Sequence, residues 1–195
     1  MAKSHLTIAI TGTPAVGKSS FARQLADVLA DSKIIEINDV VDEYTLFSKI
    51  DKMGSKVVKI KELEKKMNEI IAQDSKKFNL IIVGHLIPEL KLDQDITVVL
   101  RLNLKELIKR LEARNYEKEK IKENIVSESV DYCGIKAKEK CKETYEIETN
   151  AEKKEITEYI LARALGNPAK APEMKEISRF DELLELVTTE NKYGL

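Results

Sequence analysis

The feature that most constrains the fold of this 195-residue chain is the run Gly-Thr-Pro-Ala-Val-Gly-Lys-Ser at positions 12–19. It fits the pattern G-x-x-x-x-G-K-[ST], in which a glycine-rich turn and the start of a helix cradle phosphate oxygens. Lys18 supplies a mobile positive charge for the β- and γ-phosphates, and Ser19 supplies a hydroxyl for Mg²⁺. The run lies between an apolar, β-branched segment at 6–11 and a segment of helical periodicity at 18–30. This context predicts a loop that binds a nucleoside triphosphate.

Short apolar segments alternate with amphipathic segments along the rest of the chain. The short apolar segments predict strands at 6–11, 33–37, 78–83, 95–102 and 144–148. The amphipathic segments predict helices at 18–30, 39–47, 60–73, 104–114, 118–140 with a break near Gly134, and 152–165. We expect residues 48–60 to form a surface excursion. Since several strands are apolar throughout, the pattern predicts an α/β fold with a parallel sheet covered by helices on both faces.

The chain divides near residue 165, where Gly166-Asn-Pro168 ends the last predicted helix. The sequence therefore predicts a core domain at 1–165 and a tail at 166–195. The tail contains one amphipathic stretch at 173–187, which either packs on the core, as we expect, or binds a partner. Its predicted apolar face consists of Ile177, Phe180, Leu183, Leu184 and Val187.

Composition and charge argue against several classes of protein. The 33 basic and 34 acidic side chains nearly cancel, so no global charge attracts the chain to nucleic acid or to a membrane. No run of about 18 apolar residues predicts a membrane span, and the short polar start predicts no signal peptide. Cys133 and Cys141 lack metal-ligand spacing with the two histidines. We expect reduced thiols in a cytoplasmic protein.

A phosphate-binding loop alone does not name a reaction, because GTPases, helicases, kinases and sulfotransferases share it. The chain is small and has no Asn-Lys-x-Asp motif after its later strands, which argues against a GTPase. The arginine-containing segment 101–116, followed by a second helix, is typical of the lid of a small-molecule kinase. A shikimate or gluconate kinase is an alternative, although residues 48–60 lack the arginines that such acids would need.

Several further segments occur in a characteristic order. They are the loop at 10–19, the stretch from Tyr44 to Val58, Val83-Gly-His-Leu86, Val98–Leu102, Arg110–Tyr116, Lys122–Glu128 and Ile147–Asn150. Together they resemble the adenylate kinase isoenzyme 6 family. These are small nucleoside-monophosphate kinase-like proteins of archaea and eukaryotes that also act in small ribosomal subunit maturation. The resemblance covers roughly residues 6–165.

The resemblance implies a three-layer P-loop NTPase fold with an acceptor-binding insert at about 36–60 and a short lid at about 113–123. Because phosphoryl transfer needs positioned charge, arginines that arrive when the lid closes are the expected catalysts. The implied contacts of ATP are Gly12, Ala15, Val16, Gly17, Lys18, Ser19, Ser20 and Arg114, with Mg²⁺ on Ser19. The implied catalytic residues are Lys18, His85 and Arg114, with Arg110 as a second contact.

The activity implied by the resemblance is that of an adenylate kinase, which converts ATP and AMP to two ADP, together with ATP hydrolysis when the lid is open. The implied partners are a small-subunit ribosomal protein and, indirectly, pre-ribosomal RNA. The alternative is a slow ribosome-assembly ATPase in which nucleotide gates partner binding and kinase activity is low.

Two positions depart from the family pattern. Ala15 replaces the usual middle glycine of the loop, at little cost if its φ is negative and at roughly 1 kcal/mol or more if φ is positive. Val83 stands where the family usually has an acidic residue that holds Mg²⁺ through water. Three readings are open: Glu36 or Asp39 compensates, catalysis is slow, or the protein is chiefly a nucleotide switch.

Four other side chains each carry two interpretations. His85 either orients water or is a hydrogen-bonded histidine at a strand end. Arg101 either acts in the lid or is a buried arginine that ties the strand to the lid. Asp51 either binds the acceptor or ends a turn, and Tyr116 more often packs a hinge than stacks on a base.

Overall fold

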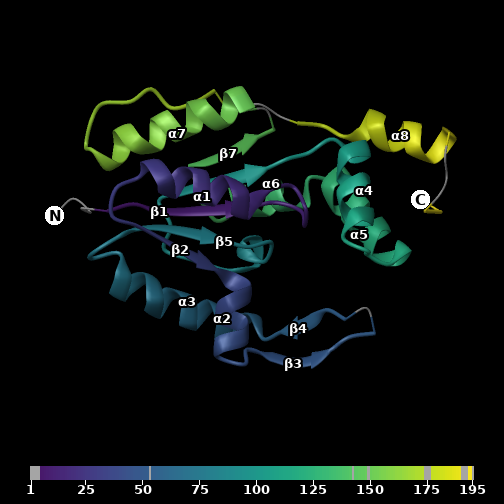
Figure 1. Ribbon diagram of the computed structural model, residues 1–195, viewed down its shortest axis with the longest axis horizontal. Coiled ribbons are helices and arrows are strands. Elements are labelled where there is room, and N and C mark those ends of the chain that lie inside the picture. Colours follow the sequence, from purple (N-terminus) through teal and green to yellow (C-terminus); the bar gives the residue numbers. More distant parts are fainter. Residues whose placement is uncertain are drawn as a thin grey trace.

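A computed structural model describes residues 5–52, 54–141, 143–148, 150–173, 177–189 and 193–194. Figure 1 shows a central sheet with helices packed on both faces, as predicted. The strands are parallel and lie in the order β2-β5-β1-β6-β7. Their bounds agree with the predicted strands within two residues: β1 (Thr7–Thr11), β2 (Ser32–Glu36), β5 (Asn79–Val83), β6 (Ile96–Leu100) and β7 (Thr144–Ile147).

Strands β1, β5 and β6 are buried at every position, because helices cover both faces of a parallel sheet. Helices α1 (Lys18–Val28) and α7 (Asn150–Ala164) pack on one face, where Ile8, Ile10 and Val83 belong to the larger core cluster. Helix α3 (Ile60–Asp74) packs on the other face, against Leu80 and Ile82. Alternate strand residues therefore enter separate cores, and helix α6 (Tyr132–Lys138) covers Val99.

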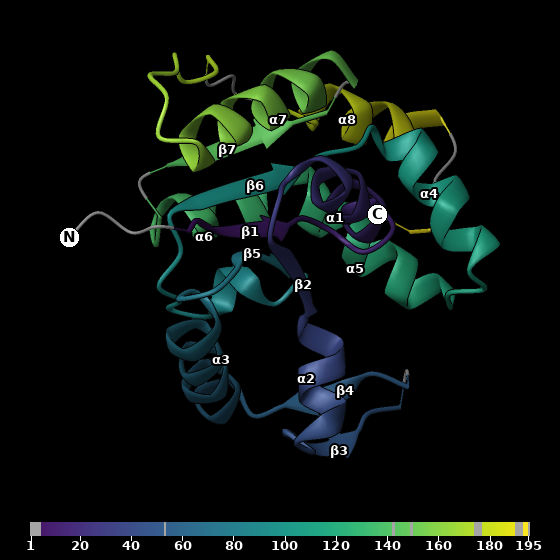
Figure 2. The same cartoon turned by 60° about the vertical axis from the view of Figure 1, so that its left-hand side comes forward.

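The predicted surface excursion at 48–60 is an antiparallel hairpin of β3 (Phe47–Ile50) and β4 (Lys56–Val58). It follows α2 (Ile37–Glu43) and lies away from the main sheet (Figure 2). The short 3-10 helix η1 (Ile87–Glu89) follows β5. The lid predicted at about 113–123 spans the end of α4 (Leu104–Ala113), the connection that follows it and the start of α5 (Lys118–Ser129). The two helices pack against each other, and we call them together with their connection the lid region.

The helix predicted at 118–140 is interrupted, as expected, but a few residues before Gly134. The break lies at Val130 and Asp131, where Asp131 adopts a φ of 52° and caps α6 by accepting a hydrogen bond from the Gly134 N–H at 3.2 Å. A Cβ on Gly134 would lie 2.3 Å from the Asp131 Oδ1 atom. The glycine therefore leaves room for the capping carboxylate and does not end the helix.

The tail helix α8 (Phe180–Thr189) packs on the core, as expected, but through a different face from the one predicted. Leu186 is 5% exposed and belongs to the larger core cluster, and Leu183 packs against the same cluster. By contrast, Phe180, Leu184 and Val187 are exposed. Because α8 packs on the core, the structure does not separate the tail from the core. The domain boundary at residue 165 therefore stays a prediction. Within the described part of the chain, no helix combines the length and apolar character that a membrane span requires.

Candidate nucleotide-binding site

The loop between β1 and α1 depends on two glycines. Gly12 and Gly17 have φ angles of 131° and 107°, a region that side chains other than hydrogen rarely allow. A Cβ on Gly12 would also lie 2.3 Å from the carbonyl oxygen of Leu100. Ala15 has a φ of 73°, so the costly alternative holds at this position, and alanine there costs roughly 1 kcal/mol or more.

Lys18 lies across this loop. Its Nζ atom donates hydrogen bonds to the carbonyl oxygens of Gly12 and Thr13, each at 2.9 Å. Desolvation by burial lowers the pKa of Lys18 to about 8, and the nearby charge of Arg114 acts in the same direction. The two carbonyl groups are neutral, so they do not balance the positive charge of this desolvated ammonium group. A phosphate group would supply the opposite charge.

A cavity of about 790 Å³ opens beside the loop. Its walls come from the start of α1, the carboxyl ends of β2 and β5, the β3–β4 hairpin, and the segment between α4 and α5, at the end of the sheet toward which the strands point (Figures 1 and 2). A crevice at this edge is where open parallel sheets bind ligands. The predicted site residues that line it are Ala15, Gly17, Lys18, Ser19, Ser20, His85 and Arg114.

Three predicted site residues are not part of the cavity wall. Gly12 and Val16 are buried within the loop. Arg110 contacts the loop without lining the cavity: its Nε atom donates to Glu106 at 2.8 Å and its Nη1 atom to the carbonyl of Ala15 at 3.4 Å. Arg110 is therefore placed to support the loop from outside, whereas Arg114, at the end of α4, faces the ligand space.

A polar contact joins the lid region to the hairpin. The Nζ atom of Lys120 donates to the Oγ atom of Ser55 at 3.0 Å and lies 4.6 Å from the centroid of the Tyr116 ring. Asp51 accepts a hydrogen bond from the Ser55 N–H at 2.8 Å and so shapes the hairpin turn. Tyr116 packs against the larger core cluster, as expected for a hinge residue. Lys120, Ser55 and Tyr116 all line the cavity, so this contact closes one side of it.

His85 follows β5, lines the cavity and is exposed to solvent. Surrounding protein desolvates the imidazole, and the positive charges of Lys18 and Lys120 add to that effect, which lowers its pKa to about 4. His85 is therefore uncharged at neutral pH. An uncharged imidazole has one nitrogen that accepts a hydrogen bond, which suits it to orient water.

Position 83 offers no metal ligand, since Val83 is 1% exposed and packs in the core. Its register partner on β2 is Glu36, which lines the cavity together with Ser19. Asp39 is exposed and lies outside the lining, so of the two acids proposed to compensate only Glu36 is in place. A hydroxyl and a carboxylate are donors that fit Mg²⁺, which nucleotide phosphates and water otherwise surround. In the described ranges no group of three or more His, Cys, Asp or Glu could hold a metal ion by itself.

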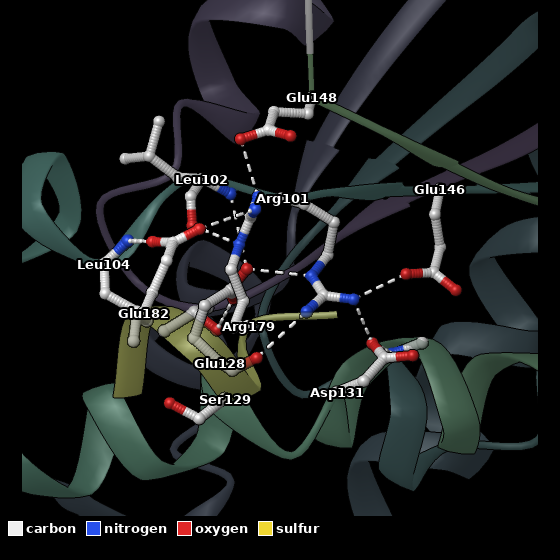
Figure 3. Close-up of polar contacts among 12 residues, drawn as sticks. Arg101, Leu102, Leu104, Glu128, Ser129, Asp131, Glu146, Glu148, Arg179 and Glu182 are labelled. Carbon is white, nitrogen blue, oxygen red and sulfur yellow. Dashed lines mark hydrogen bonds and ion pairs between the residues drawn. The ribbon is translucent and has the colours of Figure 1, made fainter. Parts of the chain in front are cut away.

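Behind the loop lies a buried ionic cluster that the sequence did not reveal as a unit (Figure 3). Arg101 is 2% exposed, and its guanidinium group pairs with Glu128, Asp131 and Glu146. The Oγ1 atom of Thr13 donates to the second oxygen of Glu128 at 2.5 Å. Arg101 is thus the buried arginine of the second interpretation, and Glu128 connects α5 directly to the phosphate-binding loop.

A second arginine, Arg179, fastens the tail beside this cluster (Figure 3). It pairs with Glu148 at 2.6 Å and with Glu182 at 3.0 Å, and its Nε atom donates to the carbonyl of Leu102 at 3.2 Å. Glu182 in turn accepts a hydrogen bond from the Leu104 N–H at 2.6 Å, at the start of α4. The tail therefore contacts and stabilises the segment that connects the sheet to the lid region.

Comparison with known proteins shows the family to which the chain belongs. Residues 8–131 match the family described as "AAA domain". The chain is 33% identical over 175 residues to a protein of Methanosarcina barkeri named "Putative adenylate kinase", covering 87% of this chain and 94% of that protein. A protein of the same name from Methanocaldococcus jannaschii is 39% identical over 145 residues, covering 74% of this chain and 77% of that protein. The chain belongs to the family that these archaeal proteins represent. The match to the Methanosarcina protein thus covers most of the chain, and the residues matched by the family model include the loop and the lid region.

Solved structures with the same architecture include the shikimate kinase of Acinetobacter baumannii in complex with shikimate. Its TM-score is 0.56 at 18% identity, and the match covers 86% of this chain and 97% of that chain. The tunicamycin resistance protein of Deinococcus radiodurans has a TM-score of 0.55 at 16% identity, with 86% and 99% covered. Identities this low show the fold alone. They confirm the predicted three-layer α/β fold of the nucleoside-monophosphate kinase type for this family member.

Proposed function

We propose that this protein transfers the terminal phosphoryl group of ATP to AMP and so forms two molecules of ADP, with Mg²⁺ as cofactor. One observation carries the proposal: a cavity of about 790 Å³ joins Lys18 and Ser19 of the phosphate-binding loop to the hairpin and to Arg114. A triphosphate on the loop would leave the space between hairpin and lid for a second nucleotide. The names of the relatives from Methanosarcina and Methanocaldococcus support AMP as the acceptor.

The roles of the residues follow from their chemistry. Lys18 would exchange its two carbonyl partners for phosphate oxygens, to which the N–H groups of the loop also donate. Arg114 would stabilise the charge that spreads over the transferred group. The contact between Lys120 and Ser55 would help to exclude water from the reacting phosphates. Mg²⁺, held through Ser19, would neutralise part of the phosphate charge when bound.

The test is ADP formation from ATP, AMP and Mg²⁺ at millimolar substrate, since KM values of most enzymes lie below about 1 mM. Reactions without AMP measure hydrolysis, and Lys18→Met, which removes the charge at the loop, serves as the inactive control. We expect ADP well above the AMP-free rate in the wild type and the AMP-free rate or less in the variant. If AMP adds nothing to ADP formation, the protein is not an adenylate kinase.

A second candidate is ATP hydrolysis that serves maturation of the small ribosomal subunit, as in the isoenzyme 6 family that the chain resembles. The uncharged His85 in the cavity favours it, because such a group can orient an attacking water. The absence of an acid at Val83 also suits a slow ATPase. The partner would be a small-subunit ribosomal protein and, indirectly, pre-ribosomal RNA, in the cytoplasm, where Cys133 and Cys141 would stay reduced.

Two measurements separate this candidate from the kinase. His85→Ala should lower AMP-independent hydrolysis more than phosphoryl transfer to AMP, because only hydrolysis needs an oriented water. A pull-down with the purified ribosomal protein should give binding that depends on ATP. Equal losses in both activities, or binding that is absent or indifferent to nucleotide, would count against the assembly role.

A further inference from the structure

Strand β2 places a carboxylate on the face of the sheet that is covered by α1, the helix that follows the phosphate-binding loop. Side chains alternate between faces along a strand, and Ile34 packs on the larger core cluster while Ile35 belongs to the opposite one. The next residue, Glu36, therefore returns to the face that α1 covers. Helix α1 begins at Lys18, so Glu36 and the start of this helix meet at the carboxyl edge of the sheet, where both line the cavity.

Strand pairing and a close backbone approach fix the position of Glu36. Glu36 pairs in register with Val83, which sets the two strands about 4.8 Å apart. Directly after them, a Cβ on Gly84 would lie 2.8 Å from the Cβ of Ile37. The glycine therefore permits the end of β5 and the start of α2 to approach closely, and this approach fixes where Glu36 projects.

Within the described part of the protein, the carboxylate of Glu36 makes no hydrogen bond or ion pair, and its charge acts on Lys18, whose pKa it raises. Although Glu36 is the N-cap residue of α2, its side chain makes no capping hydrogen bond. Asp42 also lines the cavity, but it is paired with Lys56. Several of the other charged lining groups are cations, including Lys18 and Arg114. Glu36 is thus an acid without a hydrogen bond or ion pair in a basic cavity, which Ser19 also lines.

We propose that the Glu36 carboxylate positions the Mg²⁺ of the bound nucleotide together with the Ser19 hydroxyl. This inference rests on the metal of the proposed function but not on its acceptor. A carboxylate beside a triphosphate repels it, and this repulsion is overcome only when a divalent cation is bound. Glu36 should therefore weaken the binding of nucleotide without metal and strengthen the binding of metal to the nucleotide complex. A merely structural residue would not produce opposite effects.

The variant Glu36→Gln, which keeps the shape and removes the charge, tests the proposal. Mn²⁺ replaces Mg²⁺ as a probe visible by electron paramagnetic resonance, and a non-hydrolysable ATP analogue fills the loop. We expect the Mn²⁺ affinity of the protein–analogue complex to fall about tenfold, a typical effect of losing an outer-sphere carboxylate. In EDTA, the analogue should bind the variant as tightly as the wild type or more tightly. Asp39→Asn, an exposed acid outside the cavity, should leave both affinities unchanged.

The double variant Glu36→Gln with Val83→Asp extends the test, because an acid at position 83 would sit on the register partner of Glu36. Recovery of Mn²⁺ affinity in the double variant supports the proposal. A Mn²⁺ affinity within twofold of wild type in Glu36→Gln overturns it, and so does an equal loss of analogue binding with and without metal. AMP is absent from these measurements. A protein that forms no ADP can therefore still confirm the role of Glu36, and an active kinase can refute it.

Discussion

Replacing Asp131 by asparagine tests whether the buried cluster of Glu128, Asp131 and Glu146 holds more negative charge than its surroundings can stabilise. Desolvation raises the pKa of Asp131 to about 6; the charge of Arg101 opposes this shift and that of Glu146 adds to it. Asparagine tolerates the φ of 52° and keeps an oxygen that can accept the capping hydrogen bond from Gly134. The substitution therefore removes the charge with little change in shape.

The magnitude follows from the two pKa values. The pKa is about 6 in the folded protein and 3.8 in an ordinary carboxyl. The protonated carboxyl of Asp131 therefore stabilises the fold fully below pH 4, and this stabilisation is lost as the pH rises through 6. A shift of about 2 pKa units corresponds to about 3 kcal/mol. Since 21% of the side chain is exposed, solvent screening reduces this to about 1–2 kcal/mol. Asp131→Asn should therefore be about 1–2 kcal/mol more stable than wild type at pH 8.

The assay is urea unfolding followed by circular dichroism at pH 4.5, 6 and 8, with each variant compared with wild type at the same pH. The advantage of Asp131→Asn should shrink as the pH falls, because the wild-type carboxyl then takes up its proton. Asp39→Asn, an exposed acid, provides the matched control and should show no such trend. A variant that is less stable than wild type at pH 8 would refute the reasoning, since the ion pair with Arg101 would then outweigh the cost of desolvation.

Four further predictions concern the cluster, the loop and the tail. Arg101→Met should lower the free energy of unfolding, measured in urea, by about 3–5 kcal/mol, because it leaves buried carboxylates uncompensated. The affinity for an ATP analogue, measured by calorimetry from pH 7 to 9.5, should fall above pH 8 as Lys18 loses its proton, and a flat profile would contradict this. Gly12→Ala should abolish analogue binding, since its Cβ would collide with the Leu100 carbonyl. Leu186→Ala should cost about 2–4 kcal/mol in the same urea assay if the tail helix is part of the core.

Local features of the sequence were sufficient to predict the phosphate-binding loop and the five strands of the sheet. The loop needs glycines at particular positions, and Gly12 and Gly17 indeed carry the positive φ angles that require them. Strands buried on both faces are apolar throughout, which makes segments such as 79–83 recognisable without knowledge of their neighbours. The break near Gly134 lies a few residues earlier than the glycine suggests, because a glycine can serve a close contact as well as a break, and only the position of Asp131 distinguishes the two.

Periodicity indicates which residues are buried, but it does not say which strands and helices become neighbours. Thr13 and Glu128 are 115 residues apart, and no local pattern connects them. The exposed faces of α8 were misassigned for the same reason, because ion pairs from Arg179 orient the helix. The sequence by itself thus determined a loop that can hold phosphate and a sheet to carry it. Only the tertiary structure decided that Glu36 lies in register with Val83 and faces the same cavity as Ser19, because strand order and register are set by packing between distant segments.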